Sequence, residues 1–389
     1  MHLKKYVIYI PGIKFLRHMK MYIIIKKPKI AVIGLKGLPA FGGAAAVGEN
    51  IIEELKDIYD FTVYSTSSHT HLKTGYYNGY YQIVFKKLPL KKLNTLYYYI
   101  ISAINALFHN YDLVHLHHRD AAFILTILKI KYKVIITTHS SFWVRDKWLT
   151  FKWFFEINEK YFVKKANIVT CVSLQEKRDY LNKINLDTIY IPNGIRVIKN
   201  IINDIFAQYK PYLFFGAGRI IKSKGLDVLL SALNYINYKG HLIVAGDLEQ
   251  TPTYKKEILK LSESLNVIFI GLVKDKKELL SIIKNAHIFI FPSTMEAMSM
   301  MLLEGASVKT PIICSDIIQN RDIFNENEVL FFETENYIDL SNKIKYALNN
   351  YNEMISRSEK AFQKLNNEYN WKEIANSYSI LYQKLINNG

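Results

Sequence analysis

Cysteine, glycine and proline are scarce in this sequence, and each shortage excludes a class of protein. The 389 residues include two cysteines, 17 glycines and 9 prolines, while 50% of the residues are hydrophobic. So little glycine and proline excludes a collagen-like, linker-dominated or disordered chain. Cys171 and Cys314 lie in apolar runs, which predicts buried free thiols in a reducing compartment. The length suits two globular domains, each with its own core.

Long apolar runs and metal-binding patterns are also missing. No run is long enough to span a bilayer, and the short apolar runs near the N-terminus lack a cleavage site, so we expect neither a transmembrane helix nor a signal peptide. The chain has no Asp-x-Asp pair, and its cysteines lack the spacing of metal ligands. The dinucleotide pattern Gly-x-Gly-x-x-Gly is absent, which disfavours an oxidoreductase. We therefore predict no metal and no cofactor.

Positive charge is in excess, and it is concentrated in the N-terminal half. The net charge is +17; residues 1–195 hold 28 Lys and Arg against 13 Asp and Glu, whereas residues 196–389 hold 23 against 21. A basic half attracts nucleic acid, an anionic membrane leaflet or an anionic substrate, and composition does not choose among them. Residues 1–28 form a basic extension. One interpretation is an anchor on the membrane surface. The other, given equal weight, is an added basic strand or a wrongly assigned translation start upstream of Met19 or Met21.

Apolar runs alternate with helical patterns along the rest of the chain. From Lys29 the run KIAVIGL leads through a glycine-rich loop into a helical pattern, and the unit recurs up to YIPNGI at 190–195. After a polar stretch the alternation restarts with PYLFFGAGR. This pattern predicts the α/β class, with two Rossmann-like, doubly wound parallel-sheet domains facing a cleft. We place the domains at 29–195 and 196–370, and a terminal helix packing back across the cleft at 371–389.

The segment GAGRIIKSKG brings two cations to a strand-to-helix turn. We expect the strand to end at Phe215, after which Gly216 and Gly218 allow a close approach of the backbone and Arg219 and Lys224 flank a helix start. Cations and helix N–H groups would then converge on one spot, as a diphosphate requires. Two such cations are ordinarily solvated, but their position between a strand and a helix favours binding.

Two glutamates follow the strand-like run HIFIFPS. Glu296 lies in the loop after this strand, and Glu304 lies eight residues later in a helix that we expect Ser299 to cap. Helix rise would separate the carboxylates by roughly 10 Å, which suits two ends of an extended ligand with vicinal hydroxyls. Taken singly, Glu296 could cap the helix and Glu304 could be solvated. Together with the two cations, the glutamates favour a ligand site.

The N-terminal half carries a second group of candidates. Gly42 and Gly43 precede a helix, where the backbone suits an anionic group, although an ordinary tight turn has the same composition. Alternation in LVHLHH points His115 and His117 to one face of a strand. His139, at the carboxyl end of the next strand, could hydrogen-bond a substrate hydroxyl or could be structural.

Aromatic and basic residues are interleaved over 142–165. The mixture suits a membrane interface, sugar stacking or single-stranded nucleic acid, and a core helix with a solvated basic face is an equal alternative. We predict that the acceptor or a membrane lies on this side of the molecule. The residues expected there are Lys36, Arg119, Trp143, Arg145 and Trp148.

Seven motifs occur in an order that is known from one family. They are KGLPAFGG (36–43), THSSFWVRDKW (138–148), VSLQEKRDYL (172–181), IPNGI (191–195), GAGRIIKSKG (216–225), AGD (245–247) and E-x7-E (296–304). In these motifs the chain resembles the GT-B fold glycosyltransferases of family 4, in particular the rhamnosyltransferase-like members. The resemblance implies a retaining transferase that takes a nucleotide-sugar donor and needs no metal ion.

The resemblance also implies roles for individual residues. It implies that Arg219 and Lys224 neutralise the donor diphosphate, taking over the task of a metal ion. Glu296 would contact the transferred sugar and Glu304 the ribose, with His139 near the sugar. The implied catalytic residues are Glu296, His139, Arg219 and Lys224. The implied donor-binding residues are Gly42, Gly43, Gly218, Arg219, Lys224, Glu296, Ser299, Met300 and Glu304.

Two departures from the family's pattern concern the donor. The usual Gly-Phe-Gly after the first glutamate is Ala297, Met298 and Ser299 here, and the usual His-Gly is His139-Ser140. Since the residues implied for the nucleotide are kept, these departures bear on the donor sugar rather than on activity.

We therefore predict a glycosyltransferase that moves a sugar from a nucleotide-sugar to a polysaccharide or lipid-linked glycan acceptor in envelope or surface glycan synthesis. We expect it in the cytoplasm, in peripheral contact with the anionic inner face of the membrane, and without a nucleic-acid partner. The alternative is a non-catalytic basic protein of the same fold that binds a membrane or nucleic acid. The donor, the acceptor, the linkage and the oligomeric state do not follow from the sequence.

Overall fold

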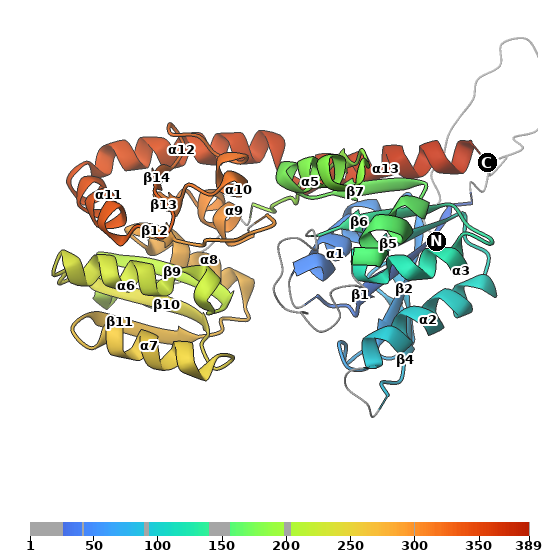
Figure 1. Ribbon diagram of the computed structural model, residues 1–389, viewed down its shortest axis with the longest axis horizontal. Helices are drawn as coiled ribbons and strands as arrows, with labels where there is room; N and C mark the ends of the chain where they lie inside the picture. The colour runs from blue at the N-terminus through green and yellow to red at the C-terminus, as the bar shows by residue number, and fades with distance from the viewer. Residues whose placement is uncertain are drawn as a thin grey trace, which may run out of the picture.

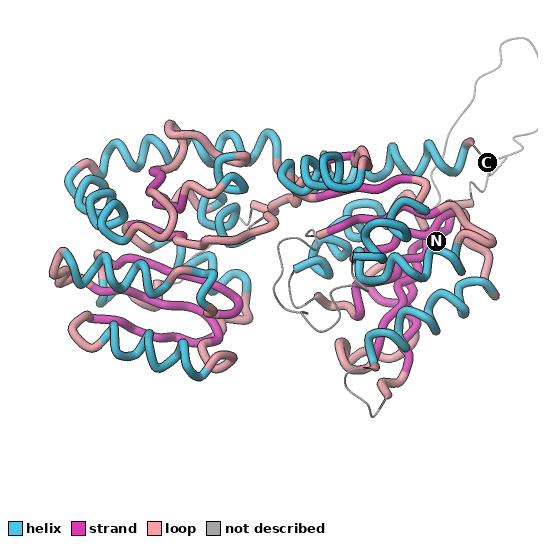
Figure 2. Tube along the Cα trace, in the orientation of Figure 1, coloured by secondary structure: helices cyan, strands magenta, loops and turns pink. Residues whose placement is uncertain are grey.

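The computed structural model contains two α/β domains. It describes residues 26–40, 43–88, 93–139, 156–197, 204–298 and 300–388. Figure 1 shows the two domains side by side, and Figure 2 shows helices packed around the strands of each domain. The two sheets confirm the predicted fold class.

The first domain is built on an eight-stranded sheet with the order β3-β4-β2-β1-β5-β6-β7-β8. Among the described strands, each pairing is parallel except that of β3 with β4. The strands are β1 Lys29–Lys36, β2 Asp60–Thr66, β3 Gly75–Tyr77, β4 Tyr80–Phe85, β5 Leu113–His117, β6 Val134–Thr138, β7 Ile168–Cys171 and β8 Ile189–Tyr190. The described α-helices between them are α1 Gly43–Leu55, α2 Asn94–Leu107, α3 Leu125–Leu128 and α5 Leu174–Ile184.

The second domain is built on a six-stranded parallel sheet with the order β11-β10-β9-β12-β13-β14. Its strands are β9 Tyr212–Arg219, β10 His241–Asp247, β11 Asn266–Gly271, β12 Ile288–Phe291, β13 Ile312–Ser315 and β14 Leu330–Phe332. The described helices are α6 Leu226–Tyr235, α7 Pro252–Ser262, α8 Lys276–Asn285, α9 Met300–Ser307, α10 Ile318–Arg321, α11 Tyr337–Asn349 and α12 Tyr351–Glu368.

The strands are apolar because helices cover both faces of each sheet. Residues 30–35 of β1 are all buried, and so are all residues of β12 and β13. Parallel sheets of doubly wound folds have such continuous apolar runs. Cys171 in β7 and Cys314 in β13 are buried free thiols, as predicted.

Strand β9 extends farther than the sequence predicted. Arg219 pairs with Asp247 of β10 across a register shift, so the strand ends at Arg219 rather than at Phe215. Residues 212–217 are buried, whereas Gly218 and Arg219 are exposed. The apolar run had therefore marked only the buried part of the strand.

In both sheets the strand order reverses at one point, between β1 and β5 and between β9 and β12. Open α/β sheets bind ligands outside the carboxyl ends of the strands at such a point. Gly34 of β1 has a φ of +110°, and a Cβ atom there would lie 1.9 Å from the carbonyl oxygen of His117 in β5. Glycine therefore lets the two strands approach each other where their carboxyl ends meet.

A linker and the last helix join the two domains. Helix α13, Trp371–Asn387, follows α12 along one side of both domains in Figure 1. Its apolar residues, among them Trp371 and Tyr378, belong to the core of the first domain. The Ile195 N–H donates to the Tyr369 carbonyl at 2.6 Å, and Arg178 of α5 forms an ion pair with Asp322 after α10 at 2.8 Å.

Candidate active site

The turn after β9 packs directly against the loop after β12. Residues Lys222–Lys224 form a 3-10 turn that ends at Gly225, whose φ is +69°. A Cβ atom at Gly225 would lie 2.1 Å from the Pro292 carbonyl oxygen. The Thr294 N–H also donates to the Ser223 carbonyl at 2.9 Å. These contacts hold the predicted cation turn and the predicted glutamate loop together at the reversal point of the second sheet.

Lys224 and Glu296, which are 72 positions apart in the sequence, form an ion pair across this contact. Lys224 Nζ lies 2.5 Å from Glu296 Oε1, and the side chains are 24% and 11% exposed. The Ser293 hydroxyl lies 2.7 Å from the same carboxylate oxygen. The lysine is thus held at the carboxyl edge of the sheet, where it is partly shielded from solvent.

Glu304 forms a second lysine–carboxylate pair. Its side chain is buried in α9, and its Oε1 atom is paired with Nζ of Lys276, the first residue of α8. Burial raises the pKa of Glu304, and the positive charge of Lys276 opposes that rise. The Oε2 atom is buried and has no hydrogen-bond partner among the described residues. The alternative interpretation, in which Glu304 is a solvated residue on the helix surface, is therefore wrong.

The remaining donor-side candidates lie around these pairs. Gly218 and Arg219 are exposed at the end of β9, and a Cβ atom at Gly218 would meet nothing within 4 Å. Met300 begins α9 and is partly buried against the core of the second domain. Ser299, the expected helix cap, lies outside the described residues.

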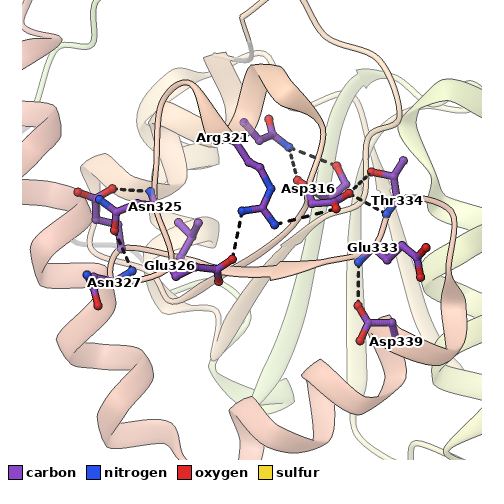
Figure 3. Close-up of polar contacts among 12 residues, drawn as sticks. Asp316, Arg321, Asn325, Glu326, Asn327, Glu333, Thr334 and Asp339 are labelled. Atoms are coloured by element: carbon purple, nitrogen blue, oxygen red, sulfur yellow. Dashed lines mark hydrogen bonds and ion pairs between the residues drawn. The ribbon is translucent and has the colours of Figure 1, made fainter.

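A polar network joins the segments that follow β13 and β14. Figure 3 shows Asp316 accepting hydrogen bonds from the backbone and hydroxyl of Thr334, with Arg321 placed between Asp316 and Glu326. The Arg321 guanidinium also lies 4.4 Å from the ring centre of Phe331. These groups satisfy one another, which indicates scaffolding rather than ligand binding.

The carboxyl end of β13 is joined to Glu296 through two serines. Asn320 donates to the Ser315 carbonyl, and the Ser315 hydroxyl donates to the Ser293 carbonyl at 2.5 Å. Ser293 is the residue whose hydroxyl lies beside Glu296. The position of the Glu296 loop therefore depends on the folded carboxyl edge of β13.

Histidines occupy the corresponding edge of the first sheet. His139 follows β6, and its Nε2 atom lies 3.2 Å from Nδ1 of His117 at the end of β5. His115 and His117 point to one face, as predicted, with ring centroids 4.1 Å apart. Burial lowers the pKa of His115 to about 3 and holds that of His117 well below its usual range. Both buried rings are thus neutral, and His117 contributes a neutral hydrogen-bonding atom to His139.

Arg119 does not lie on the acceptor or membrane surface, where we had expected it. Its side chain is 5% exposed, and its Nε atom lies 3.5 Å from Glu159 Oε2 and 3.4 Å from Asp120 Oδ1. Tyr180 donates to the other oxygen of Glu159. A buried guanidinium needs such partners, so the charge of Arg119 is used inside the domain.

Other candidates of the first domain are described only in part. Lys36 is partly buried and ends β1 with a φ of +67°, and Gly43 begins α1 with a φ of +59°. Four predicted site residues of the first domain lie outside the described residues, namely Gly42, Trp143, Arg145 and Trp148. Nearly all of the 1–28 extension lies outside them as well.

Two polar residues of the site were missed from the sequence. Ser293 and Lys276 contact the two glutamates, but they lie in FPS and DKKE segments that have no distinctive pattern. Within the described ranges, no group of three or more His, Cys, Asp or Glu residues could hold a metal ion. In the same ranges, no helix has the length and hydropathy of a membrane span.

Two family models match the chain one after the other. Residues 41–199 match the model described as Glycosyltransferase Family 4, and residues 197–364 match the model described as Glycosyl transferases group 1. The chain belongs to the family 4 glycosyltransferases. It is an enzyme that transfers a sugar from a nucleotide-sugar, as predicted, and retention of configuration is a property of its family. The rhamnosyltransferase-like subgroup stays a prediction.

Individual relatives agree with this assignment. Uncharacterized glycosyltransferase MJ1178 of Methanocaldococcus jannaschii is 26% identical over 360 residues, covering 89% of this chain and 96% of the relative. The N,N′-diacetylbacillosaminyl-diphospho-undecaprenol alpha-1,3-N-acetylgalactosaminyltransferase of Campylobacter jejuni is 27% identical over 171 residues, 44% of each chain. Sucrose-phosphate synthase from Thermosynechococcus elongatus has a TM-score of 0.80 at 18% identity, covering 94% of this chain and 100% of that structure. The structural likeness confirms the GT-B fold.

Proposed function

We propose that this family 4 enzyme binds the diphosphate of its donor with Arg219 and Lys224 and transfers the sugar without a metal ion. The Lys224–Glu296 pair at the reversal point of the second sheet carries the proposal. A lysine and an exposed arginine beside open backbone at Gly218 supply the positive charge that a leaving diphosphate needs. Gly42, Gly43, Ser299 and Met300 complete the donor site in this proposal.

The same pair accounts for how the donor would engage Glu296. A diphosphate is a doubly charged, multidentate acceptor, so it competes with one carboxylate for the Lys224 ammonium. Once the lysine turns to the phosphate, Glu296 keeps its contact with Ser293 and is free to accept from hydroxyls of the transferred sugar. His139, held by His117, approaches that sugar from the first domain.

For the acceptor, we propose a lipid-linked or polysaccharide glycan bound on the side of the first domain. The surplus of Lys and Arg in residues 1–195 supports an anionic acceptor or an anionic inner membrane leaflet. The Campylobacter jejuni relative is named for an acceptor with a diphospho-undecaprenol group. Lys36, Trp143, Arg145 and Trp148 remain the proposed contacts, and we withdraw Arg119 because it is buried.

Turnover of a donor panel tests the proposal. Purified protein would be incubated in EDTA with UDP-, GDP-, dTDP- and ADP-sugars and a diphospho-polyprenol glycan, and products would be followed by mass spectrometry. We expect transfer from one donor class, with retained configuration, and its loss in Glu296→Gln. No transfer in any combination, together with salt-sensitive binding of vesicles or polynucleotides that Glu296→Gln leaves intact, would instead support the non-catalytic basic protein.

A further inference from the structure

The two glutamates of the site are held by lysines in different ways. Among the described residues, Glu296 is the carboxylate that pairs with Lys224, and the Ser293 hydroxyl lies beside the same carboxylate. For Glu304, Lys276 is the partner that the structure resolves among the described residues. Lys276 comes from α8, which follows a different strand and packs beside α9. The Glu304 carboxylate thus depends on a residue that lies outside both recognised motifs.

Burial makes this dependence physically important. The Glu304 side chain is 4% exposed, whereas that of Lys276 is 48% exposed. Removing a carboxylate from water favours its neutral form, and a lysine at contact distance favours the charged form. α9 packs against α8 and α12, and Lys276 is the charged group on these elements that acts on Glu304. Without Lys276, the carboxyl would take up a proton at a higher pH.

The pair also gives the carboxylate a direction. Lys276 Nζ pairs with Oε1 of Glu304. The other oxygen, Oε2, is buried and accepts no hydrogen bond from a described residue. A buried acceptor without a donor is costly unless something else satisfies it. Asp275 fixes the start of α8 by accepting from the N–H groups of Lys277 and Glu278, so Lys276 approaches Glu304 from a fixed helix end. One oxygen is thereby anchored, and the other is left for a ligand hydroxyl.

We propose that Lys276 is a positioning residue for the donor: it anchors one oxygen of the Glu304 carboxylate and turns Oε2 toward the vicinal hydroxyls of the donor ribose. This inference rests on the proposed function, which gives Glu304 the ribose. Lys276 itself does not contact the donor. It differs in this respect from Lys224, which exchanges its carboxylate for the diphosphate.

Nucleotide binding with and without the ribose hydroxyl tests the proposal. Isothermal titration of UDP and 2′-deoxy-UDP, and of GDP and 2′-deoxy-GDP, would be run on wild type, Lys276→Met, Lys276→Arg and Lys277→Met. Lys277 is the neighbouring exposed lysine and serves as the matched control. We expect Lys276→Met to weaken binding of the preferred ribonucleotide about tenfold and to leave its deoxy analogue nearly unchanged, since the hydroxyl contact is the one lost. Lys276→Arg and Lys277→Met should bind like wild type.

A pH series separates positioning from a general loss of structure. Because the Glu304 pKa rises further without Lys276, the defect of Lys276→Met should be larger at pH 6 than at pH 8.5. Wild type at each pH corrects for titration of the phosphate itself. Unfolding midpoints would show that the variants are folded, and Lys276→Gln would replace Lys276→Met if the latter did not fold.

Each other result overturns the proposal. Equal, pH-independent losses for the ribo- and deoxynucleotides would mean that Lys276 contacts the donor itself. Binding like that of Lys277→Met would mean that Lys276 has no part in the site. Glu304→Gln provides the reference. If this variant does not reduce the difference in affinity between UDP and 2′-deoxy-UDP, then the role proposed for Glu304 is wrong, and not only the role proposed for Lys276.

Discussion

The two domains have the same sheet topology around the reversal point but place different chemistry there. In the second domain, lysines pair with carboxylates at the carboxyl edge, within partial reach of solvent. In the first domain, the corresponding edge carries the neutral rings of His115 and His117, and Arg119 is buried against Glu159 inside the domain. A charged edge suits a diphosphate, whereas a neutral hydrogen-bonding edge suits sugar hydroxyls.

The comparison also separates surface charge from site chemistry. The basic surplus belongs to residues 1–195, yet the lysines of the proposed donor site belong to the second half, which is nearly balanced in charge. Within that balanced half, the close contact of Gly225 with Pro292 holds the cation turn at the reversal point. The Ser315–Ser293 hydrogen bond holds the glutamate loop beside it. Net charge therefore predicts which half meets an anionic acceptor or membrane, and local geometry predicts where the donor binds.

The largest expected effect is on the charged edge. Lys224→Ala should lower kcat/KM for the nucleotide-sugar by about 10²–10³-fold, because it removes a positive charge from the leaving diphosphate. Lys222→Ala, in the same 3-10 turn, is the matched control, since Lys222 is exposed and pairs with Asp227 and Glu257. Steady-state kinetics on both variants would check this. Equal losses in both would show that only the charge of the turn matters, not the placement of Lys224.

The next effect concerns the glycine that seats the cation turn. Gly225→Ala should lower the free energy of unfolding by about 3 kcal/mol, since a left-handed φ and contact with the Pro292 carbonyl both oppose a Cβ atom. Gly218→Ala, in open space, should change it by less than about 0.5 kcal/mol. Urea unfolding of the two variants measures the difference. Similar stabilities would contradict the close packing of the two loops.

A smaller effect, on pH dependence, belongs to the first domain. Burial raises the pKa values of Glu159 and Glu176 to about 7, above their unfolded values, with Arg119 opposing the rise in both. A raised folded pKa stabilises the protonated form, so this contribution is complete below about pH 4.5 and is lost as the pH rises through about 7. We expect Glu176→Gln to reduce the loss of stability between pH 5 and pH 8 by about 2 kcal/mol. Thermal unfolding of wild type and Glu176→Gln across this range would measure the difference. If the two acids were ionised at every pH in the range, stability would depend on pH in the same way in both proteins.

The smallest expected effect is on the neutral edge. His139→Asn should lower kcat about tenfold, the cost of one hydrogen bond to the sugar, and leave nucleotide binding unchanged. His109→Asn, at an exposed position beyond α2, is the control. Turnover and nucleotide titration on the same samples would separate the two quantities. A loss of nucleotide affinity in His139→Asn would contradict the division of labour between the edges.

Much of this arrangement was readable from the sequence, and the parts that were not have physical reasons. Apolar runs predicted the two sheets because strands covered on both faces carry no polar alternation. Lys224 and Glu296 were singled out as candidates because each follows such a run. Their contact depends on the order of the strands in the sheet, which differs from their order along the chain. The end of β9 was misplaced because its last residues are exposed. The burial of Arg119 was missed because its partner Glu159 lies 40 positions away, in a segment where the aromatic and basic residues, and not the acids, formed the recognised pattern.

The most direct test of the central claim is a calorimetric titration of the protein with UDP, GDP, dTDP and ADP in the presence of EDTA. It would be run on wild type, on the Arg219→Ala/Lys224→Ala double variant and on Lys222→Ala. The account predicts that one nucleotide binds wild type and Lys222→Ala alike, and that the double variant no longer binds it. Binding that needs a divalent metal, or that survives in the double variant, would contradict a donor site built from the cations of the second domain.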